Sequence, residues 1–138
     1  MPSTDAWKIA EIATKDGRVR FFMKNMSPAR EPADPAYPYL AYVTFRYGDS
    51  DERGLPQGDD LMTVQDIENS AAVPLEADHV AVHVAEVLGH GVKDLLFYVR
   101  DLGIFAERSA QLLRKYSSVS PSIEITLDAA WTQYTDFP

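Results

Sequence analysis

Residues 80–100, with the sequence VAVHVAEVLGHGVKDLLFYVR, predict two β-strands folded back on each other. Valines recur through the first half, and the second half contains the apolar run LLFYV. Gly89 and Gly91 lie on either side of His90 and permit the positive φ angles that a tight hairpin turn needs. Many β-branched and aromatic residues around one glycine-rich turn are typical of the centre of a sheet. We therefore expect strands over Val80–Val87 and Leu95–Arg100.

Hydrophobic periodicity predicts the other elements on both sides of this hairpin. Apolar and polar residues alternate in four further stretches, and Asp16-Gly17 supplies a hairpin turn between the first two. Two other stretches have apolar residues at helical spacing. The expected strands are Trp7–Thr14, Val19–Met23, Leu40–Arg46 and Ile123–Leu127, and the expected helices are Asp59–Ala71 and Leu102–Tyr116. Four prolines in Ser27–Pro38 exclude a helix or a central strand there, so we expect an extended loop that crosses the sheet.

The predicted order of elements is β-β-β-α-β-β-α-β. Its last six elements match the β-α-β-β-α-β order of the ferredoxin-like split βαβ fold. We expect an α+β sandwich in which the helices pack on one face of an antiparallel sheet, with the N-terminal hairpin extending or covering that sheet. The opposite face would be open or covered by the proline loop. No repeat or linker divides residues 1–138, so a single domain is expected.

The composition excludes several classes of function. The chain has no cysteine, which excludes disulfides, thiolate catalysis and thiolate metal sites. No stretch approaches the ~18 apolar residues of a membrane span, and the N-terminal residues do not resemble a signal peptide. Hydrophobic residues make up 46% of the chain, which is enough for a folded core. We expect a cytoplasmic domain with no membrane partner and no cofactor.

The net charge of −8 is concentrated in one connection of the chain. Residues 48–78 contain nine acids and one base, Arg53, while the other 12 acids and 12 bases cancel. Nucleic-acid binding needs clustered Lys and Arg, so we expect no nucleic-acid partner. An acidic surface suits a basic protein partner, because its field accelerates their encounter; the alternative is a solvated helix face that only aids solubility. The candidate recognition residues are Asp49, Asp51, Glu52, Asp59, Asp60, Asp66 and Glu68.

The histidines are the main candidates for chemistry. His79 and His83 have the spacing of a helical metal pair, but they alternate with Val80, Val82 and Val84, which favours a strand. Four residues along a strand span ~13 Å. That separation is too long for one ion, so we expect no metal site. A hydrolase or transferase would use His83 or His90 with a nearby acid, in a cleft where a histidine, a carboxylate and a donor converge. Because the sequence has no nucleophile elbow or phosphate loop, we do not expect an enzyme.

A small-molecule binding module is the second alternative. Aromatic residues near the strand ends and in the C-terminal segment would line its pocket between the sheet and that segment. Core packing is the more common role of such residues, and we expect it here. The residues concerned are Phe97, Tyr98, Trp131 and Tyr134.

Several short motifs resemble one protein family over nearly the whole chain. They are Gly54-Leu55-Pro56, Ile67-Glu68, Gly91, the run Asp94-Leu95-Leu96-Phe97-Tyr98, and the closing Asp128-Ala129-Ala130-Trp131-Thr132-Gln133-Tyr134. With these motifs the chain resembles the bacterial domain of unknown function 695 family. This resemblance implies kinship with protein-binding regulators, because some members are joined to a domain like the regulator of ribonuclease E activity B. It assigns no residue a role.

Together these features predict a non-enzymatic protein-binding regulator or inhibitor. Nuclease regulators and the immunity proteins that neutralise toxins both face basic surfaces, which an acidic domain would cover. The oligomeric state stays open.

Overall fold

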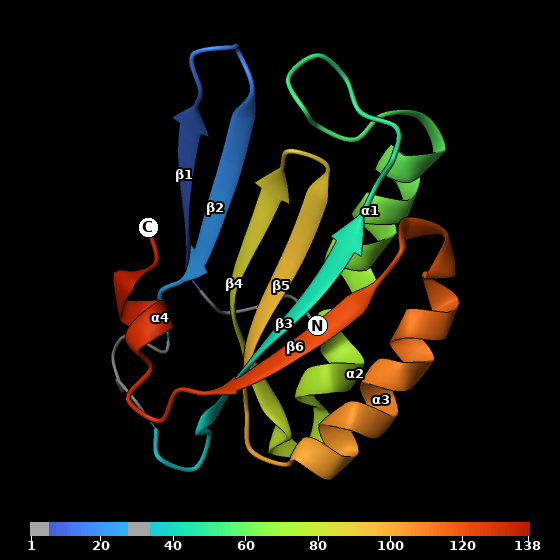
Figure 1. The fold of residues 1–138 in the computed structure, drawn as a ribbon. Coiled ribbons are helices and arrows are strands. Elements are labelled where there is room, and N and C mark those ends of the chain that lie inside the picture. Colours follow the sequence, from blue (N-terminus) through green and yellow to red (C-terminus); the bar gives the residue numbers. More distant parts are fainter. Residues whose placement is uncertain (1–5, 28–33) are drawn as a thin grey trace.

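The computed structural model describes residues 6–27 and 34–138 and contains one antiparallel sheet of six strands in the order β1-β2-β4-β5-β3-β6 (Figure 1). The strands are β1 (Trp7–Ala13), β2 (Val19–Asn25), β3 (Tyr39–Arg46), β4 (Ala81–Gly89), β5 (Val92–Val99) and β6 (Ser122–Leu127). The helices are α1 (Gly58–Ser70), α2 (Ala72–Glu76), α3 (Leu102–Lys115) and α4 (Thr132–Asp136). The expected α+β class with an antiparallel sheet is therefore confirmed. No helix in these described ranges is long and apolar enough to cross a membrane.

The central hairpin of β4 and β5 forms where the valine-rich stretch predicted it. Its turn consists of His90 and Gly91, with φ angles of 54° and 80°. Positive φ at both turn residues matches the right-handed twist of the two strands. Gly89 ends β4 against β2, and a Cβ atom there would lie 2.5 Å from the carbonyl oxygen of Val19. A glycine is therefore required at this close approach of two strands. β5 begins at Val92, three residues before the predicted start.

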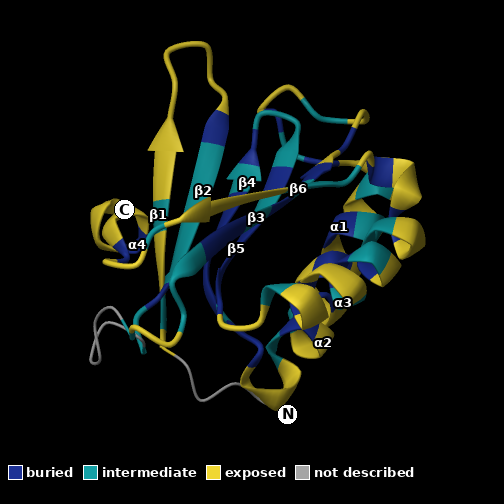
Figure 2. Ribbon diagram, turned by 60° about the horizontal axis from the view of Figure 1, so that its bottom comes forward, coloured by how far each residue is buried: buried dark blue, intermediate teal, exposed yellow. Residues whose placement is uncertain are grey.

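The first hydrophobic core lies between the sheet and the layer of α1, α2 and α3. Successive side chains of β3 point to opposite faces of the sheet, so Ala41, Val43 and Phe45 all point into this core. Each of these side chains is fully buried. α1 contributes Val64 and Ile67, while the outer surfaces of the helices are exposed (Figure 2). α3 has the clearest start signal, because the Asp101 side chain accepts a hydrogen bond from the N–H of Ile104 at 3.0 Å.

A second core lies on the opposite face of the sheet, and here the sequence-based expectation was wrong. Not all helices pack on one face, because α4 and its flanking residues cover the other one (Figure 1). Trp131 and Tyr134 are buried there against Leu40, Val84 and other sheet residues. Two large aromatic side chains in a five-residue helix with its cap bury enough apolar surface to hold this short segment on the sheet.

The end of the proline loop also contributes to this second core. Residues 28–33 of the predicted loop lie outside the described part of the chain. Tyr37, which follows them, packs against the second core. Its carbonyl oxygen accepts a hydrogen bond from the indole N–H of Trp131 at 3.0 Å. The loop and the C-terminal segment therefore share the cover of this face.

Candidate functional site

Acidic side chains in the β3–α1 loop and in the first turn of α1 hold that loop in shape through hydrogen bonds to its backbone. The Asp60 carboxylate accepts hydrogen bonds from the backbone N–H groups of Gly48 and Asp49, at 3.0 and 2.9 Å. The Asp51 carboxylate accepts from the N–H groups of Arg53 and Leu55, at 2.9 and 3.1 Å. The Leu55 N–H has the largest effect in lowering the pKa of Asp51. These carboxylates satisfy backbone donors that a loop between a strand and a helix would otherwise leave to water.

The structure brings five of the seven predicted recognition residues to one end of the molecule and separates the other two. The five are Asp49, Asp51, Glu52, Asp59 and Asp60, in the β3–α1 loop and the first turn of α1. Asp66 lies farther along α1 and faces α3, whereas Glu68 contacts Lys93 of β5. The seven residues therefore do not form one continuous surface.

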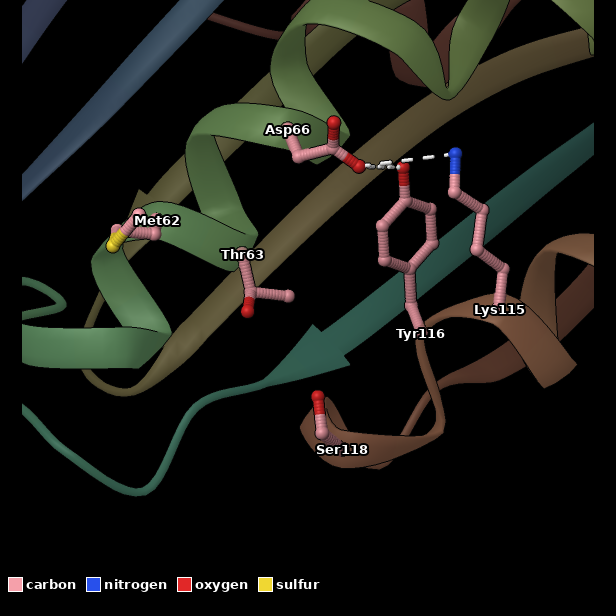
Figure 3. Close-up of a pocket in the computed structure, with 6 residues that line it drawn as sticks. All are labelled: Met62, Thr63, Asp66, Lys115, Tyr116 and Ser118. Atoms are coloured by element: carbon pink, nitrogen blue, oxygen red, sulfur yellow. Dashed lines mark hydrogen bonds and ion pairs between the residues drawn. The ribbon is translucent and has the colours of Figure 1, made fainter.

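Asp66 is joined to the end of α3 across an open depression of about 320 Å³ (Figure 3). The Tyr116 hydroxyl donates a hydrogen bond to Asp66 at 2.5 Å, and the Lys115 ammonium lies 3.8 Å from the same carboxylate. Burial, the hydrogen bond to Asp66 and the charge of Asp66 all raise the pKa of Tyr116. Met62 and Ser118 line the rim of the depression. The charges in it already pair with each other, so this contact holds α1 against α3.

Two of the seven predicted recognition residues, Glu52 and Asp59, differ from the other five because their carboxylates have no partner within the described part of the chain. Among the described residues, the carboxylates of Glu52 and Asp59 have neither a hydrogen-bond donor nor a basic side chain within ion-pair distance, and both residues are exposed. The Arg53 side chain lies nearby, but it pairs with Asp51 at 3.5 Å. Glu52 and Asp59 thus present negative charge to solvent without a role in the loop.

A buried polar cluster surrounds His83 on the helix-facing side of the sheet. Its imidazole Nε2 lies 3.3 Å from the Glu86 carboxylate, and the Lys93 ammonium lies 2.5 Å from Glu86 and 3.0 Å from Glu68. The Lys93 side chain is 0% exposed and that of His83 is 7% exposed. The His83 ring also stacks on Phe97, with 4.8 Å between centroids. A histidine, a carboxylate and a donor do meet here, but the side chains of His83, Glu86 and Lys93 are buried, and only Glu68 reaches the surface.

Sequence reasoning missed this cluster, although one signal was present. Lys93 occupies a core-facing position in a strand whose other core-facing side chains are apolar, and it lies opposite Leu88 in the β4–β5 register. A lysine at such a position needs an anionic partner, and Glu86 supplies it from the adjacent strand. His90, the other catalytic candidate, lies in the hairpin turn and does not join the cluster. In the described part of the chain, no three histidine, aspartate or glutamate side chains are arranged so that they could hold a metal ion.

The four predicted pocket aromatics do not line a common pocket. Tyr98, Trp131 and Tyr134 are buried in the second core, whereas Phe97 lies on the other face of the sheet in the first core. Asp128 organises the three in the second core. Its carboxylate accepts the Tyr98 hydroxyl at 2.6 Å and also accepts the N–H groups that begin α4. Asp128 lies four residues before α4, and its part in starting this helix was not predicted from the sequence.

These features define an α+β domain in which one antiparallel sheet carries a hydrophobic core on each face. A family model described as "Family of unknown function (DUF695)" matches residues 5–137. The chain belongs to this family, as its motifs indicated. No curated protein matches the chain. No solved structure matches it either.

Proposed function

We propose that the domain is a non-enzymatic regulator or inhibitor that binds a basic surface of another protein. The observation that supports this proposal is the position of the charge. Residues 48–78 account for the entire net charge of −8, and five of their acids gather at the β3–α1 end of the molecule. Such a local field attracts a positively charged partner and disfavours nucleic acid.

Within this end of the molecule, the acids have two different roles. Asp49, Asp51 and Asp60 shape the loop through their hydrogen bonds. Glu52 and Asp59 have carboxylates that remain available to a lysine or arginine of the partner. A partner that pairs with these two gains charge–charge contacts without breaking any hydrogen bond within the loop.

We also assign β3, α1, β4, β5, α3 and β6 to a ferredoxin-like split βαβ unit, in which the β1–β2 hairpin extends the sheet beyond β4. The strand order β4-β5-β3-β6 and the antiparallel pairing of all neighbours support this assignment. In this arrangement the β3–α1 loop projects from one end of the sheet, where a partner can approach it.

The test compares three immobilised proteins in capture from a native lysate of the source cells. They are the wild type, the double variant Glu52→Gln/Asp59→Asn, and the control Glu11→Gln/Glu107→Gln. The control removes two exposed carboxylates from outside the acidic segment, so it changes the net charge by the same amount. We expect the wild type and the control to retain the same basic protein, which the first variant loses.

Salt provides a second readout for the same experiment. Retention should weaken between about 50 mM and about 300 mM salt, because contacts between exposed charges are screened over that range. Capture of the same protein by all three forms would contradict the proposal. Retention that does not change with salt would also contradict it.

A further inference from the structure

A second depression, of about 340 Å³, lies on the second face of the sheet beside α4. Its walls come from β3 and from two C-terminal elements, β6 and α4, that follow β3 by more than 70 residues. The volume falls at the lower end of the range that small-molecule sites occupy. Its lining consists of two aliphatic residues, of which the leucine is fully buried, and four residues with polar groups, namely Leu40, Ile125, Tyr42, Glu124, Thr126 and Gln133.

The strand register places the polar groups of this depression together. Tyr42 of β3 lies directly opposite Glu124 of β6, and Leu40 lies opposite Thr126. Residues that face each other across an antiparallel pair project from the same side of the sheet, with Cβ atoms ~5 Å apart. Among the described residues, the Tyr42 hydroxyl, the Glu124 carboxylate and the Gln133 side-chain amide have no hydrogen-bond or ion-pair partner. Three polar groups are thus available to one bound molecule.

The electrostatic environment of the depression is negative. Burial raises the pKa of Tyr42, and the charges of Asp94, Asp128 and Glu124 raise it further. Arg46 is the basic residue on β3 near this site, and its guanidinium is held at the end of the strand by the Ser120 carbonyl and the Ser122 hydroxyl. Asp128 and Asp94 have donors of their own, Tyr98 and Thr44, which leaves Glu124 as the acid with an open carboxylate.

We propose that this depression binds a small organic cation, with an ammonium or guanidinium group on an apolar or aromatic body. The cationic group pairs with the Glu124 carboxylate. The body of the ligand lies over the Tyr42 ring, which also attracts the positive charge. The Gln133 amide and the Thr126 hydroxyl bond to a polar substituent of the ligand. This site is separate from the acidic β3–α1 end and does not depend on the function proposed for it.

Two matched probe molecules test the charge requirement. Tyramine and 4-hydroxyphenylacetate share a phenol ring, and the first carries an ammonium where the second carries a carboxylate. In a titration followed by amide chemical shifts, tyramine should bind with a Kd of about 1 mM or tighter. The shifts should concentrate at residues 40–42, 124–126 and 133. 4-Hydroxyphenylacetate should bind at least about tenfold more weakly, because Glu124 repels it.

Variants of the chain locate the binding. Glu124→Gln should weaken tyramine binding at least about tenfold, while Glu107→Gln, which removes a carboxylate from the exposed surface of α3, should leave it unchanged. Thr126→Lys places an ammonium on the chain beside Glu124 and should also abolish binding. Since Glu124 and Thr126 are exposed, both variants should fold. The Glu52→Gln/Asp59→Asn variant should bind tyramine as the wild type does, so the two proposals can fail separately.

Three results would overturn the assignment. The first is no saturable tyramine binding below about 10 mM. The second is equal binding by the wild type and Glu124→Gln, which would place the cation elsewhere. The third is equal binding of tyramine and 4-hydroxyphenylacetate, which would show that the charge of the ligand does not matter.

Discussion

The indole ring of Trp131 lies flat against the ring of Tyr98, with 4.2 Å between centroids and 7° between planes. Around this stack, the Tyr98 hydroxyl donates to Asp128, and Tyr134 packs edge-on against the indole. The stack therefore joins a short C-terminal helix to the middle of the sheet.

Replacing Trp131 by alanine should destabilise the domain by about 3–5 kcal/mol, because it removes a buried aromatic side chain and leaves a cavity in the second core. Urea unfolding at 25 °C, followed by circular dichroism, measures this loss. Trp131→Phe keeps a ring against Tyr98 and should cost clearly less. Equal losses in the two variants would show that the stack does not stabilise the second face.

Replacing Lys93 by methionine should destabilise the domain by about 3–5 kcal/mol, since it leaves Glu86 without its buried cation. Adding Glu86→Gln to this variant removes the unpaired charge and should recover part of the loss. The coupling between the two substitutions comes from a double-mutant cycle of unfolding free energies. Strictly additive losses would mean that the pair does not interact in the folded protein.

The unfolding free energy should fall as the pH decreases below about 4, and Asp128 should contribute to this fall. Partial burial opposes ionisation of Asp128, but the hydrogen bonds from Tyr98, Gln133 and Thr132 outweigh it and lower its pKa. A carboxylate with a lowered pKa in the folded state stabilises above its unfolded pKa and loses this effect as it is protonated.

The variant Asp128→Asn isolates that contribution. Its unfolding free energy should depend less on pH between about 5 and about 3 than that of the wild type. Asp94 should have the opposite effect on the pH dependence of the unfolding free energy, because burial raises its pKa. Ionisation of Asp94 therefore destabilises the folded state as the pH rises, and Asp94→Asn should remove that effect. Identical pH profiles for the wild type and Asp128→Asn would contradict the prediction.

Replacing Asp60 by alanine should cost about 1–3 kcal/mol of stability, because the N–H groups of Gly48 and Asp49 lose their charged acceptor. Glu52→Gln should change the unfolding free energy by less than about 0.5 kcal/mol, since its carboxylate has no role in the loop. Thermal unfolding of the two variants separates these cases. A large loss for Glu52→Gln would mean that it cannot serve as a neutral probe of partner binding.

The strands and main helices could be predicted because their signals are local. Alternation in β3 placed Ala41, Val43 and Phe45 on one side and Leu40 and Tyr42 on the other, and the two cores confirm both sets. The hairpin turn at His90 and Gly91 followed from glycine chemistry alone. Such patterns need no knowledge of distant contacts.

The second core and the ion cluster could not be predicted in the same way. The sheet residues that bury Trp131 lie 33 or more positions earlier in the chain, and nothing in the sequence around Trp131 shows which face of the sheet receives it. Lys93 and Glu68 meet only after α1 packs on the sheet. The position of the acidic segment in the chain is read directly from the sequence. Its division between loop-forming and open carboxylates depends on backbone geometry, which the sequence does not show.

Hydrogen bonds join the C-terminal segment to the N-terminal hairpin: the Tyr134 hydroxyl donates to the Asn25 carbonyl, and the Lys24 ammonium donates to the Phe137 carbonyl. On the ribosome, β2 and the second face of the sheet must therefore wait for the last part of the chain before they are covered. Contacts over more than a hundred residues also slow folding, because a long loop must close first. Newly made chains would expose Leu40, Val84 and Tyr98 during that delay, and apolar surface exposed in this way promotes aggregation until the last segment packs.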